Sequence, residues 1–376
     1  MRDKIKILAA TFVTLFLISF LPTVIAQASA AIVVTIDGKY ITFEEQKPFI
    51  IEGRTLVPVR GVFEHLGFDV DWNPETRQAT LESDDFIVIL TIDNDVFTVN
   101  SEELRLEVPA QIIGGSTMIP FRAVLESVGY YADWSAEERA VIVVPAVTIG
   151  GRLIPITEQA LYLPHMNLTN EDIIPLRYMT NLNTLQLSAN HISDISPLTT
   201  LTSLTTLSLD HTQIVDLSPL EKLVRLEHLE LFGNETPEAR DYTPLINLQE
   251  LTFLGFGQNG ISDLEPLVEV LLELPNLTRL SLSWNQISDI SPLAELVNLE
   301  ELWLHENDVE DISALAYLVN LTELRIPWNP RISDLSPLAG LTNLRLLQLG
   351  GEQTKDTSPL AHLTYLVIED DPPLTD

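Results

Sequence analysis

One leucine phrase recurs along the second half of this 376-residue chain and limits its fold more than any other feature. Each copy reads Leu-x-x-Leu-x-(Leu/Ile/Phe)-x-x-Asn or a close variant, and successive copies lie 22 to 26 residues apart. The copies begin at Leu182, Leu204, Leu226, Leu251, Leu277, Leu299, Leu321 and Leu344. Repeats of this length bury their apolar face only by stacking on their neighbours, so the phrase predicts an elongated solenoid.

Apolar and polar residues alternate within each repeat. Leu207 and Leu209 are expected to face the core, whereas Ser208 and Asp210 face outward from a short strand. Eight regular repeats therefore predict a parallel sheet on the concave face, on the order of 40 Å long at about 4.8 Å per strand. Ser-Pro in the second half of the phrase predicts short helices or 3-10 turns on the convex face, with serine as the N-cap.

Two polar positions recur at the turns. Asparagine after the strand can donate to and accept from unpaired backbone groups, which predicts a hydrogen-bonded ladder weakened at Thr212 and Glu352. The asparagines are Asn190, Asn234, Asn259, Asn285, Asn307 and Asn329. Aspartate recurs on the return side, at Asp194, Asp216, Asp263, Asp289, Asp311 and Asp334. We interpret these aspartates as structural, because calcium-binding repeats need denser oxygen donors with glycine between them.

The phrase with Ser-Asp-(Ile/Leu)-Ser-Pro-Leu in its second half closely resembles the internalin-type leucine-rich repeat of bacterial surface proteins. The resemblance covers roughly residues 181 to 368. It implies a surface that binds a ligand through the concave face, without naming that ligand. No Leu-Pro-x-Thr-Gly sorting signal is present, so the covalent wall attachment of anchored internalins is not expected to carry over.

Residues 34–144 contain an internal duplication at an offset of 62 residues. Seven residues of the first copy recur in the second, and each copy predicts short strands, a helix and further strands. The first copy has Gly53, Pro58, Arg60, Glu64, Gly67, Asp71 and Trp72, and the second has Gly115, Pro120, Arg122, Glu126, Gly129, Asp133 and Trp134. The fold class predicted for the whole chain is therefore a duplicated α+β domain followed by the solenoid.

The duplicated module is similar to the copper amine oxidase N-terminal-like (stalk) domain, on the strength of Gly-Arg-Thr-Leu-Val-Pro-Val-Arg from Gly53 and of Val70-Asp71-Trp72. Amine oxidase chemistry belongs to a separate catalytic domain with three copper-binding histidines, and this module has only His65. We expect Arg60 and Arg122 to brace their helices by pairing with the glutamates four residues on. The alternative is that they contact an anion or a glycan.

The first thirty residues resemble an export signal. Basic residues precede an apolar run from Ile7 to Ala26, and Ala28-Ser29-Ala30 supplies a cleavage site. The alternative is an uncleaved membrane anchor, since the run approaches the roughly 20 apolar residues that span a bilayer.

We expect a monomer outside the cell or in the envelope of a Gram-positive bacterium. The expected divisions are the signal (1–30), the duplicated module (31–145), a linker (146–155), an N-terminal cap repeat (156–180) and the repeats (181–376).

Composition narrows the classes of partner and of chemistry. A net charge of −33 disfavours nucleic acid, and the absence of cysteine excludes disulfides and thiolate metal sites. The seven histidines are dispersed and no catalytic motif appears, so we expect no enzyme, cofactor or metal. The expected partner is a protein or a cell-wall glycan. The alternative is a purely structural envelope component without a discrete ligand.

The outward positions change along the array. They are small or polar in the first repeats, which look like scaffold, and become large later, with tryptophan and arginine typical of binding hot spots. Insertions after Asn234 and within 268–275 predict a local ridge, the second with a longer helix. Trp284 and Trp328 directly precede turn asparagines, so packing over loop edges is their alternative role. The candidate binding residues are Phe232, Phe253, Trp284, Trp303, His305, Glu323, Arg325 and Trp328.

Overall fold

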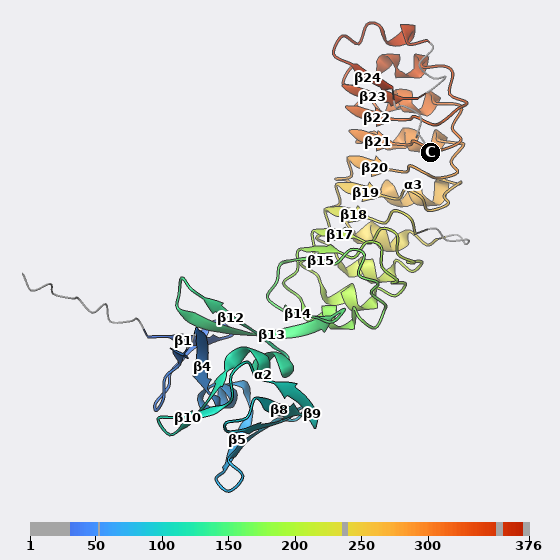
Figure 1. Cartoon of the computed structure of the whole chain (residues 1–376). Coiled ribbons are helices and arrows are strands. Elements are labelled where there is room, and N and C mark those ends of the chain that lie inside the picture. The colour runs from blue at the N-terminus through green and yellow to red at the C-terminus, as the bar shows by residue number, and fades with distance from the viewer. Residues whose placement is uncertain (1–30, 52, 235–239, 351–355, 371–376) are drawn as a thin grey trace, which may run out of the picture.

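The computed structural model describes residues 31–51, 53–234, 240–350 and 356–370. A module of small sheets stands at one end of a long curved array (Figure 1). The predicted fold class, a duplicated α+β domain followed by a leucine-rich-repeat solenoid, is confirmed. The predicted signal, residues 1–30, and Glu352 lie outside the described residues. Within the described ranges, no helix has the length and apolarity needed to span a bilayer.

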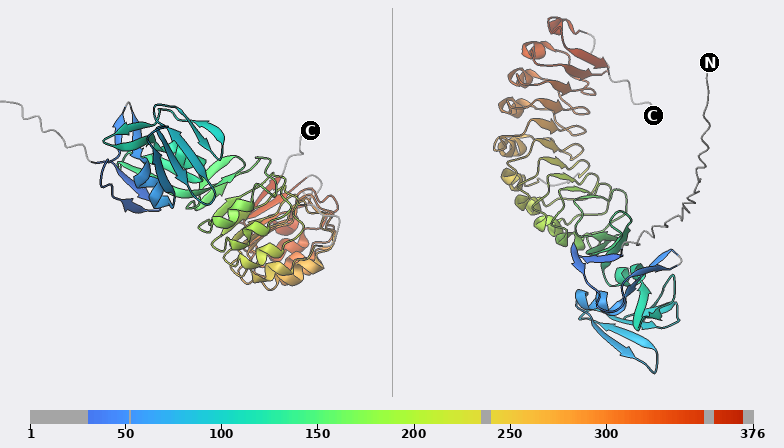
Figure 2. Two further views of the ribbon diagram at one scale, coloured as in Figure 1. Left: turned by 90° about the horizontal axis from the view of Figure 1, so that it is seen from below. Right: turned by 90° about the vertical axis from the view of Figure 1, so that its left-hand side faces the viewer.

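One parallel sheet runs the length of the array and lines its concave side (Figure 2). Ten strands form it among the described residues, rather than the eight predicted, because the cap repeat and the last segment each add one. The strands are β15 (Ala160–Tyr162), β16 (Thr184–Gln186), β17 (Thr206–Ser208), β18 (His228–Glu230), β19 (Phe253–Gly255), β20 (Arg279–Ser281), β21 (Glu301–Trp303), β22 (Glu323–Arg325), β23 (Leu346–Leu349) and β24 (Val367–Asp370).

Short 3-10 helices occupy the convex side of the array. One convex segment is an α-helix, α3 (Glu265–Leu271), as the insertion in that repeat predicted. The 3-10 helices are η2 (Ile174–Tyr178), η3 (Ser196–Thr200), η4 (Ser218–Lys222), η5 (Thr243–Asn247), η6 (Ser291–Glu295), η7 (Ser313–Tyr317), η8 (Ser336–Gly340) and η10 (Ser358–Leu360).

The predicted N-cap role of serine is wrong. In η3, the cap residue is Ile195, which makes no side-chain cap bond, and Ser196 is the first residue of the helix. The free backbone N–H of Ser196 instead donates to the Asp194 carboxylate at 2.8 Å. The same bond, 2.8 to 3.0 Å long, forms at Asp216, Asp241, Asp263, Asp289, Asp311, Asp334 and Asp356. The recurring aspartates are therefore structural, as predicted, and they supply the bond that serine was expected to make.

The repeat leucines build a continuous core from Ile149 to Leu360. Leu185, Leu207 and Leu229 occupy equivalent positions on neighbouring strands and are fully buried. Burying each such side chain stabilises the fold by about 1.5–3 kcal/mol. Because equivalent leucines meet across every strand pair from β15 to β23, the outward positions are aligned in rows.

The predicted asparagine ladder connects consecutive coils. Asn307 Nδ2 donates to Leu304 O in its own coil and to Leu282 O in the preceding coil, both at 3.0 Å. Its Oδ1 accepts from Ile287 N at 3.0 Å. Asn190, Asn234, Asn285 and Asn329 bond in the same way. Thr212 has a single donor, which lies 2.7 Å from Leu209 O and from Asn234 Oδ1, so it makes no donation to the preceding coil.

A buried arginine completes the ladder where the first insertion interrupts it. Arg240 is 9% exposed, and its Nη2 donates to Asn234 O at 2.6 Å and to Ile214 O at 2.7 Å. Its Nη1 donates to Asn259 Oδ1 at 2.9 Å, so the guanidinium spans the gap between two coils. The ring of Phe256 lies 5.8 Å from the guanidinium carbon. The sequence suggested only a surface ridge here, and the structural role of Arg240 was missed.

Replacing Arg240 by methionine should destabilise the array, because three acceptors lose their donor inside the protein. We expect a loss of about 3 kcal/mol in the free energy of unfolding, measured by urea denaturation. Arg225→Met, at an exposed arginine on the neighbouring coil, is the matched control and should change stability by less than about 0.5 kcal/mol. Equal stability of the Arg240 variant and the wild type would contradict this role.

Three small sheets form the N-terminal module. The first has the order β12-β13-β1-β2 with β14 paired to β13, the second β10-β11-β4-β3 and the third β5-β6-β7-β8-β9. The strands are β1 (Val33–Ile36), β2 (Lys39–Ile41), β3 (Phe49–Ile51), β4 (Arg54–Pro58), β5 (Asp69–Asn73), β6 (Gln78–Glu82), β7 (Ile87–Thr91), β8 (Val96–Val99), β9 (Glu102–Arg105), β10 (Gln111–Ile113), β11 (Ser116–Pro120), β12 (Tyr130–Ser135), β13 (Ala140–Ile149) and β14 (Arg152–Pro155).

The two copies of the duplication exchange strands. β1 of the first copy pairs with β13 at the end of the second, and β4 pairs antiparallel with its counterpart β11. Each copy has one helix at the same place, α1 (Val59–Phe63) extended by η1 (Glu64–Leu66), and α2 (Phe121–Ser127). Gly67 and Gly129 follow these helices with φ of 86° and 82°, the left-handed conformation that favours glycine. The exchange merges both copies around one core.

The segment predicted as a linker, 146–155, is part of a β-hairpin between the module and the array. Ala146 to Ile149 of β13 pair with β14, and Ile149 and Ile154 are buried in the core of the array. The divisions at residues 145 and 155 stay a prediction. The hairpin explains how the chain enters the solenoid, because its apolar side chains cover the first coil.

Candidate functional site

The strands β18 to β22 display two rows of outward residues across the concave face. The first row is His228, Phe253, Arg279, Glu301 and Glu323, and the second is Glu230, Gly255, Ser281, Trp303 and Arg325. Residues in one row are direct cross-strand neighbours, close enough for their side chains to touch. The rows therefore bring side chains from almost a hundred residues of sequence onto one surface.

Aromatic rings and guanidinium groups form a contiguous cluster on this surface. The Phe253 ring stacks on His228 at 4.3 Å and meets the Trp303 ring at 5.7 Å. Arg279 lies over Phe253, with its guanidinium carbon 5.3 Å from the ring centre, and Arg325 lies over Trp303 at 4.8 Å. Such cation–π contacts are worth about 0.5–2 kcal/mol each. We call His228, Phe253, Arg279, Trp303, Glu323 and Arg325 the concave cluster.

Glu323 fixes two members of the concave cluster. Its Oε1 accepts from Trp303 Nε1 at 3.0 Å and from Arg325 Nε at 2.6 Å. Small residues make room for the indole, because Gly255 and Ser281 are the neighbours of Trp303 along its row. The indole can therefore reach across β20 to Phe253 on β19. Trp303, Glu323 and Arg325, three of the candidate residues, are joined by these bonds, which hold the ring of Trp303 in one orientation.

Phe253 was predicted to be displayed, but the structure buries it to 5% exposure. His228, Trp303 and Arg279 cover the ring from three neighbouring strands. The prediction considered each repeat alone, and the covering residues come from other repeats. Phe253 thus supports the concave cluster from beneath, and His228 and Arg279, which were not predicted, complete its surface.

The remaining candidates lie at the exit edge of the strands. Trp284 is 43% exposed, meets the His305 ring edge-on at 6.5 Å, and His305 Nδ1 lies 2.8 Å from Ser283 Oγ. Trp328 is half-buried and makes no ring contact with Trp284 or Trp303 among the described residues. The three tryptophans therefore do not form the single patch that their spacing suggested.

Trp284 and Trp328 share an unusual backbone conformation. Their φ angles are 60° and 59°, and the residue before every other turn asparagine or Thr212 is also left-handed. The turn geometry imposes this conformation, which costs about 1–2 kcal/mol for a residue with a Cβ atom. Gly233, at the same position of another coil, avoids that cost.

Phe232 lies on the side of the earlier repeats, half-buried against His211 at 5.1 Å between ring centres. Its backbone N–H donates to Asp210 Oδ1 at 2.8 Å. It packs directly over Gly257, where a Cβ atom would overlap the ring. Phe232 therefore belongs to a polar group around Asp210, in the same coil as His228 of the concave cluster.

That polar group is a pair of half-buried carboxylates that the sequence suggested to be scaffold. Ser208 Oγ donates to Asp210 Oδ2 at 3.1 Å, and His228 Nε2 lies 3.0 Å from Glu230 Oε1. Burial raises the pKa of Asp210 to about 6, and the nearby Glu230 carboxylate adds to the rise against the Phe232 N–H, which lowers it. The hydrogen bond from His228 lowers the pKa of Glu230. The pair therefore holds a proton on Asp210 more readily than on Glu230.

In the N-terminal module, Arg60 and Arg122 each pair with the glutamate four residues on, as predicted, although Arg122 has a closer partner in Asp133, 2.7 Å from its Nη2. Arg60 Nη1 bonds Glu64 Oε1 at 2.8 Å, and Arg122 Nε lies 3.8 Å from Glu126 Oε1. Each guanidinium also bonds a backbone carbonyl of the next strand, Val70 O or Ala132 O, at 2.8 and 3.2 Å. These contacts account for the recurrence of the two arginines without a ligand.

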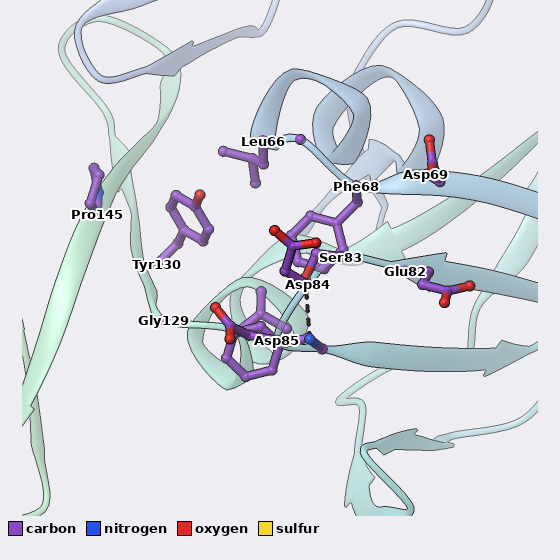
Figure 3. Close-up of a pocket in the computed structure, with 13 residues that line it drawn as sticks. Leu66, Phe68, Asp69, Glu82, Ser83, Asp84, Asp85, Gly129, Tyr130 and Pro145 are labelled. Atoms are coloured by element: carbon purple, nitrogen blue, oxygen red, sulfur yellow. Dashed lines mark hydrogen bonds between the residues drawn. The ribbon is translucent and has the colours of Figure 1, made fainter.

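An acidic hollow of about 610 Å³ lies where the helix ends of the two copies meet (Figure 3). The carboxylates of Asp69, Glu82, Asp84 and Asp85 line one side, and Tyr130 stands opposite. In the described part of the chain, no group of three or more histidine, aspartate or glutamate side chains is arranged to hold a metal ion. We assign no ligand to this hollow.

Replacing Asp210 by asparagine should change how stability depends on pH. An aspartate whose folded pKa lies above its unfolded value favours folding when protonated, and that contribution is lost as the pH rises through about 6. Asparagine mimics the protonated form. Relative to the wild type, we expect the variant's free energy of unfolding to rise between pH 4 and pH 7, by on the order of 1 kcal/mol after solvent screening. Thermal or urea unfolding across this range measures the difference, and a gap independent of pH would contradict the assignment.

Comparisons with known proteins match both parts of the chain. Residues 35–143 match the copper amine oxidase N-terminal domain, and residues 249–295 and 275–317 match leucine rich repeats (2 copies). No curated protein matches the chain. The three similar solved structures below are all from Listeria monocytogenes.

Internalin C2 of strain 4b F2365 is 34% identical over 53% of this chain and 85% of its own, with a TM-score of 0.45. Internalin inlF of the same strain is 24% identical over 60% of this chain and 91% of its own, with a TM-score of 0.37. The functional domain of InlJ is 19% identical over 58% of this chain and 55% of its own, with a TM-score of 0.39.

The repeat phrase, the asparagine ladder and the identity to internalin C2 over most of that protein's length agree with one another. The strand-exchanged module in front of the array is equally specific, because its whole duplication falls within one family match. The chain belongs to the internalin-type leucine-rich-repeat proteins and carries a copper amine oxidase N-terminal domain before its repeats.

Proposed function

We propose that this chain is an exported, non-catalytic binding protein whose repeat array recognises a ligand through the concave face. The concave cluster carries the proposal. Rings and guanidinium groups from five adjacent strands meet there, and tryptophan and arginine are the residues most often found at binding hot spots. A surface of this kind is suited to a protein or a glycan. We place a protein ligand first, because the chain is a leucine-rich-repeat protein of this type.

The cluster is already ordered without a ligand, which favours affinity. Glu323 holds the indole N–H of Trp303 and the Arg325 guanidinium through charged or directional bonds. Side chains that are fixed in advance lose less conformational entropy on binding. The neighbouring Glu301, whose pKa is raised by burial and by the Glu323 carboxylate, adds a second carboxyl group to the same face. The face therefore offers a ligand carboxyl and guanidinium groups beside an apolar patch.

We assign the N-terminal module the role of an envelope-associating or spacer domain, and the location outside the cell follows from the signal-like first thirty residues. Trp284, His305 and Trp328 form the proposed rim of the binding surface, and Phe232 follows its first strand, β18. The competing function is a purely structural envelope component, which needs no ordered aromatic cluster on an open face. The cluster favours the binding role.

Loss of the concave cluster should abolish ligand capture. The full mature protein, immobilised as bait, is exposed to the culture medium and to wall fractions of the bacterium that produces it. Trp303→Ala should reduce retention of the captured partner at least about tenfold, and adding Trp284→Ala should reduce it further. Tyr317→Ala on the convex helix η7, where the side chain is 65% exposed, is the matched control and should bind like the wild type.

Retention that is equal for Trp303→Ala, the double variant and the wild type would contradict the binding surface and favour the structural alternative. Circular dichroism of each variant separates loss of binding from loss of fold.

We expect the Trp284 side chain to contribute to the exposed surface rather than to the stability of the fold. Trp284→Gly should be more stable than Trp284→Ala by about 1 kcal/mol, because only glycine adopts the left-handed conformation without strain. Urea unfolding measures both variants side by side. The opposite order, with alanine the more stable, would show that the turn relaxes when the indole is removed.

A further inference from the structure

The N-terminal module contains a cleft of about 610 Å³ that is separate from the acidic hollow and from the repeat array. Helix α1 and strand β5 of the first copy form one wall, and the hairpin β10–β11 of the second copy forms another. We propose that this cleft is a second binding site and that it takes a saccharide segment of a wall polymer. Its size is within the range of small-molecule sites.

The duplication itself shows that this cleft has diverged. In the second copy, Asp133 pairs with Arg122 at 2.7 Å, and Trp134 packs against the core of the module. In the first copy, the corresponding Asp71 has no hydrogen bond or ion pair among the described residues. The corresponding Trp72 is 38% exposed and lines the cleft. The same framework therefore carries the pair in two versions, because the aspartate is ion-paired in the second copy and lines the cleft in the first.

The exposed Trp72 is not explained by the packing of the module. It lies opposite Ala79, and its indole nitrogen has no hydrogen-bond partner among the described residues. A large exposed ring beside polar groups is the arrangement found where a ligand presents both an apolar face and hydroxyl groups. In the second copy, the equivalent ring of Trp134 is partly buried against the core of the module.

The polar groups of the cleft are mostly acceptors. His65 Nδ1 lies 2.9 Å from Gly61 O, and since a carbonyl only accepts, Nδ1 must donate, which makes Nε2 an acceptor in the neutral ring. Glu45 and Asp71 add carboxylates, and Ser116 Oγ lies 3.4 Å from Glu45 Oε2. The Arg60 guanidinium, the cation of this wall, is engaged by Glu64 and by Val70 O.

This set of groups selects the ligand chemistry. Carboxylates without a free cation repel phosphate and carboxylate ligands, which disfavours the anionic polymers of the envelope. Sugar hydroxyls are donors that match the acceptors, and the apolar face of a sugar ring matches the Trp72 indole. An amine on the sugar would gain further from Asp71 and Glu45. Neutral and amine-bearing sugars share this chemistry, and they are distinguished by experiment.

Isothermal titration of the full mature protein with a tetramer of N-acetylglucosamine and with the de-N-acetylated glucosamine tetramer tests the proposal. At least one tetramer should bind with a Kd below about 1 mM, and Trp72→Ala should weaken that binding at least about tenfold. Binding of the acetylated form alone identifies a neutral sugar, and binding of the glucosamine form alone identifies the amine. Trp72→Phe should keep affinity within about threefold, because the ring face is preserved.

Tyr317→Ala, at an exposed ring on the convex side of the repeat array, is the control for the loss of an aromatic side chain outside the cleft, and it should leave the titration unchanged. The proposal is overturned if neither tetramer binds the wild type, or if Trp72→Ala binds as tightly as the wild type. Because Trp72 is exposed, its substitution should leave the thermal unfolding midpoint within about 2 °C, which rules out unfolding as the cause of a lost titration.

Discussion

The hydrogen-bonded asparagine ladder is the constraint on which the rest of the array depends. Each buried asparagine joins its own coil to the preceding one, and the turn that it fixes sets the residue before it in a left-handed conformation. Leucine burial supplies most of the stability, but the hydrophobic effect is non-directional and does not by itself fix the register of the strands. The ladder adds direction, and it keeps successive strands in the single register that aligns Phe253 with Arg279 and brings Trp303 beside Arg325.

The sequence predicted the architecture well because stacking repeats need the same residue at the same place. Leucines, asparagines and aspartates were assigned correctly for that reason. The concave cluster was predicted only in part, because its contacts cross repeats. Phe253 is covered by His228 and Arg279, and neither side chain carries a signal within its own repeat. An alignment of the repeats by their leucines would place His228, Phe253 and Arg279 in one row. This alignment is the signal from which their contact could have been predicted.

The irregular positions were the hardest to predict. Arg240 lies at the edge of an insertion that looks like a loop, yet its guanidinium restores the ladder between two coils. The duplicated module shows the opposite problem, because its sequence pattern is regular while the contacts of the two copies differ. Its two copies share seven residues at a fixed offset, but Arg122 pairs with Asp133 while Arg60 turns to Glu64. Equal residues thus acquire different roles when one partner moves, which a pattern of identities does not reveal.

The central claim is that the outward rows of β18 to β22 form the binding surface. Amide hydrogen exchange of the full mature protein, with and without its captured partner, tests this claim most directly. Added protection should concentrate in residues 226–234 and 251–329 on the strand side, while the convex helices η6 and η7 exchange as before. Protection confined to the convex helices or to the N-terminal module would contradict the account.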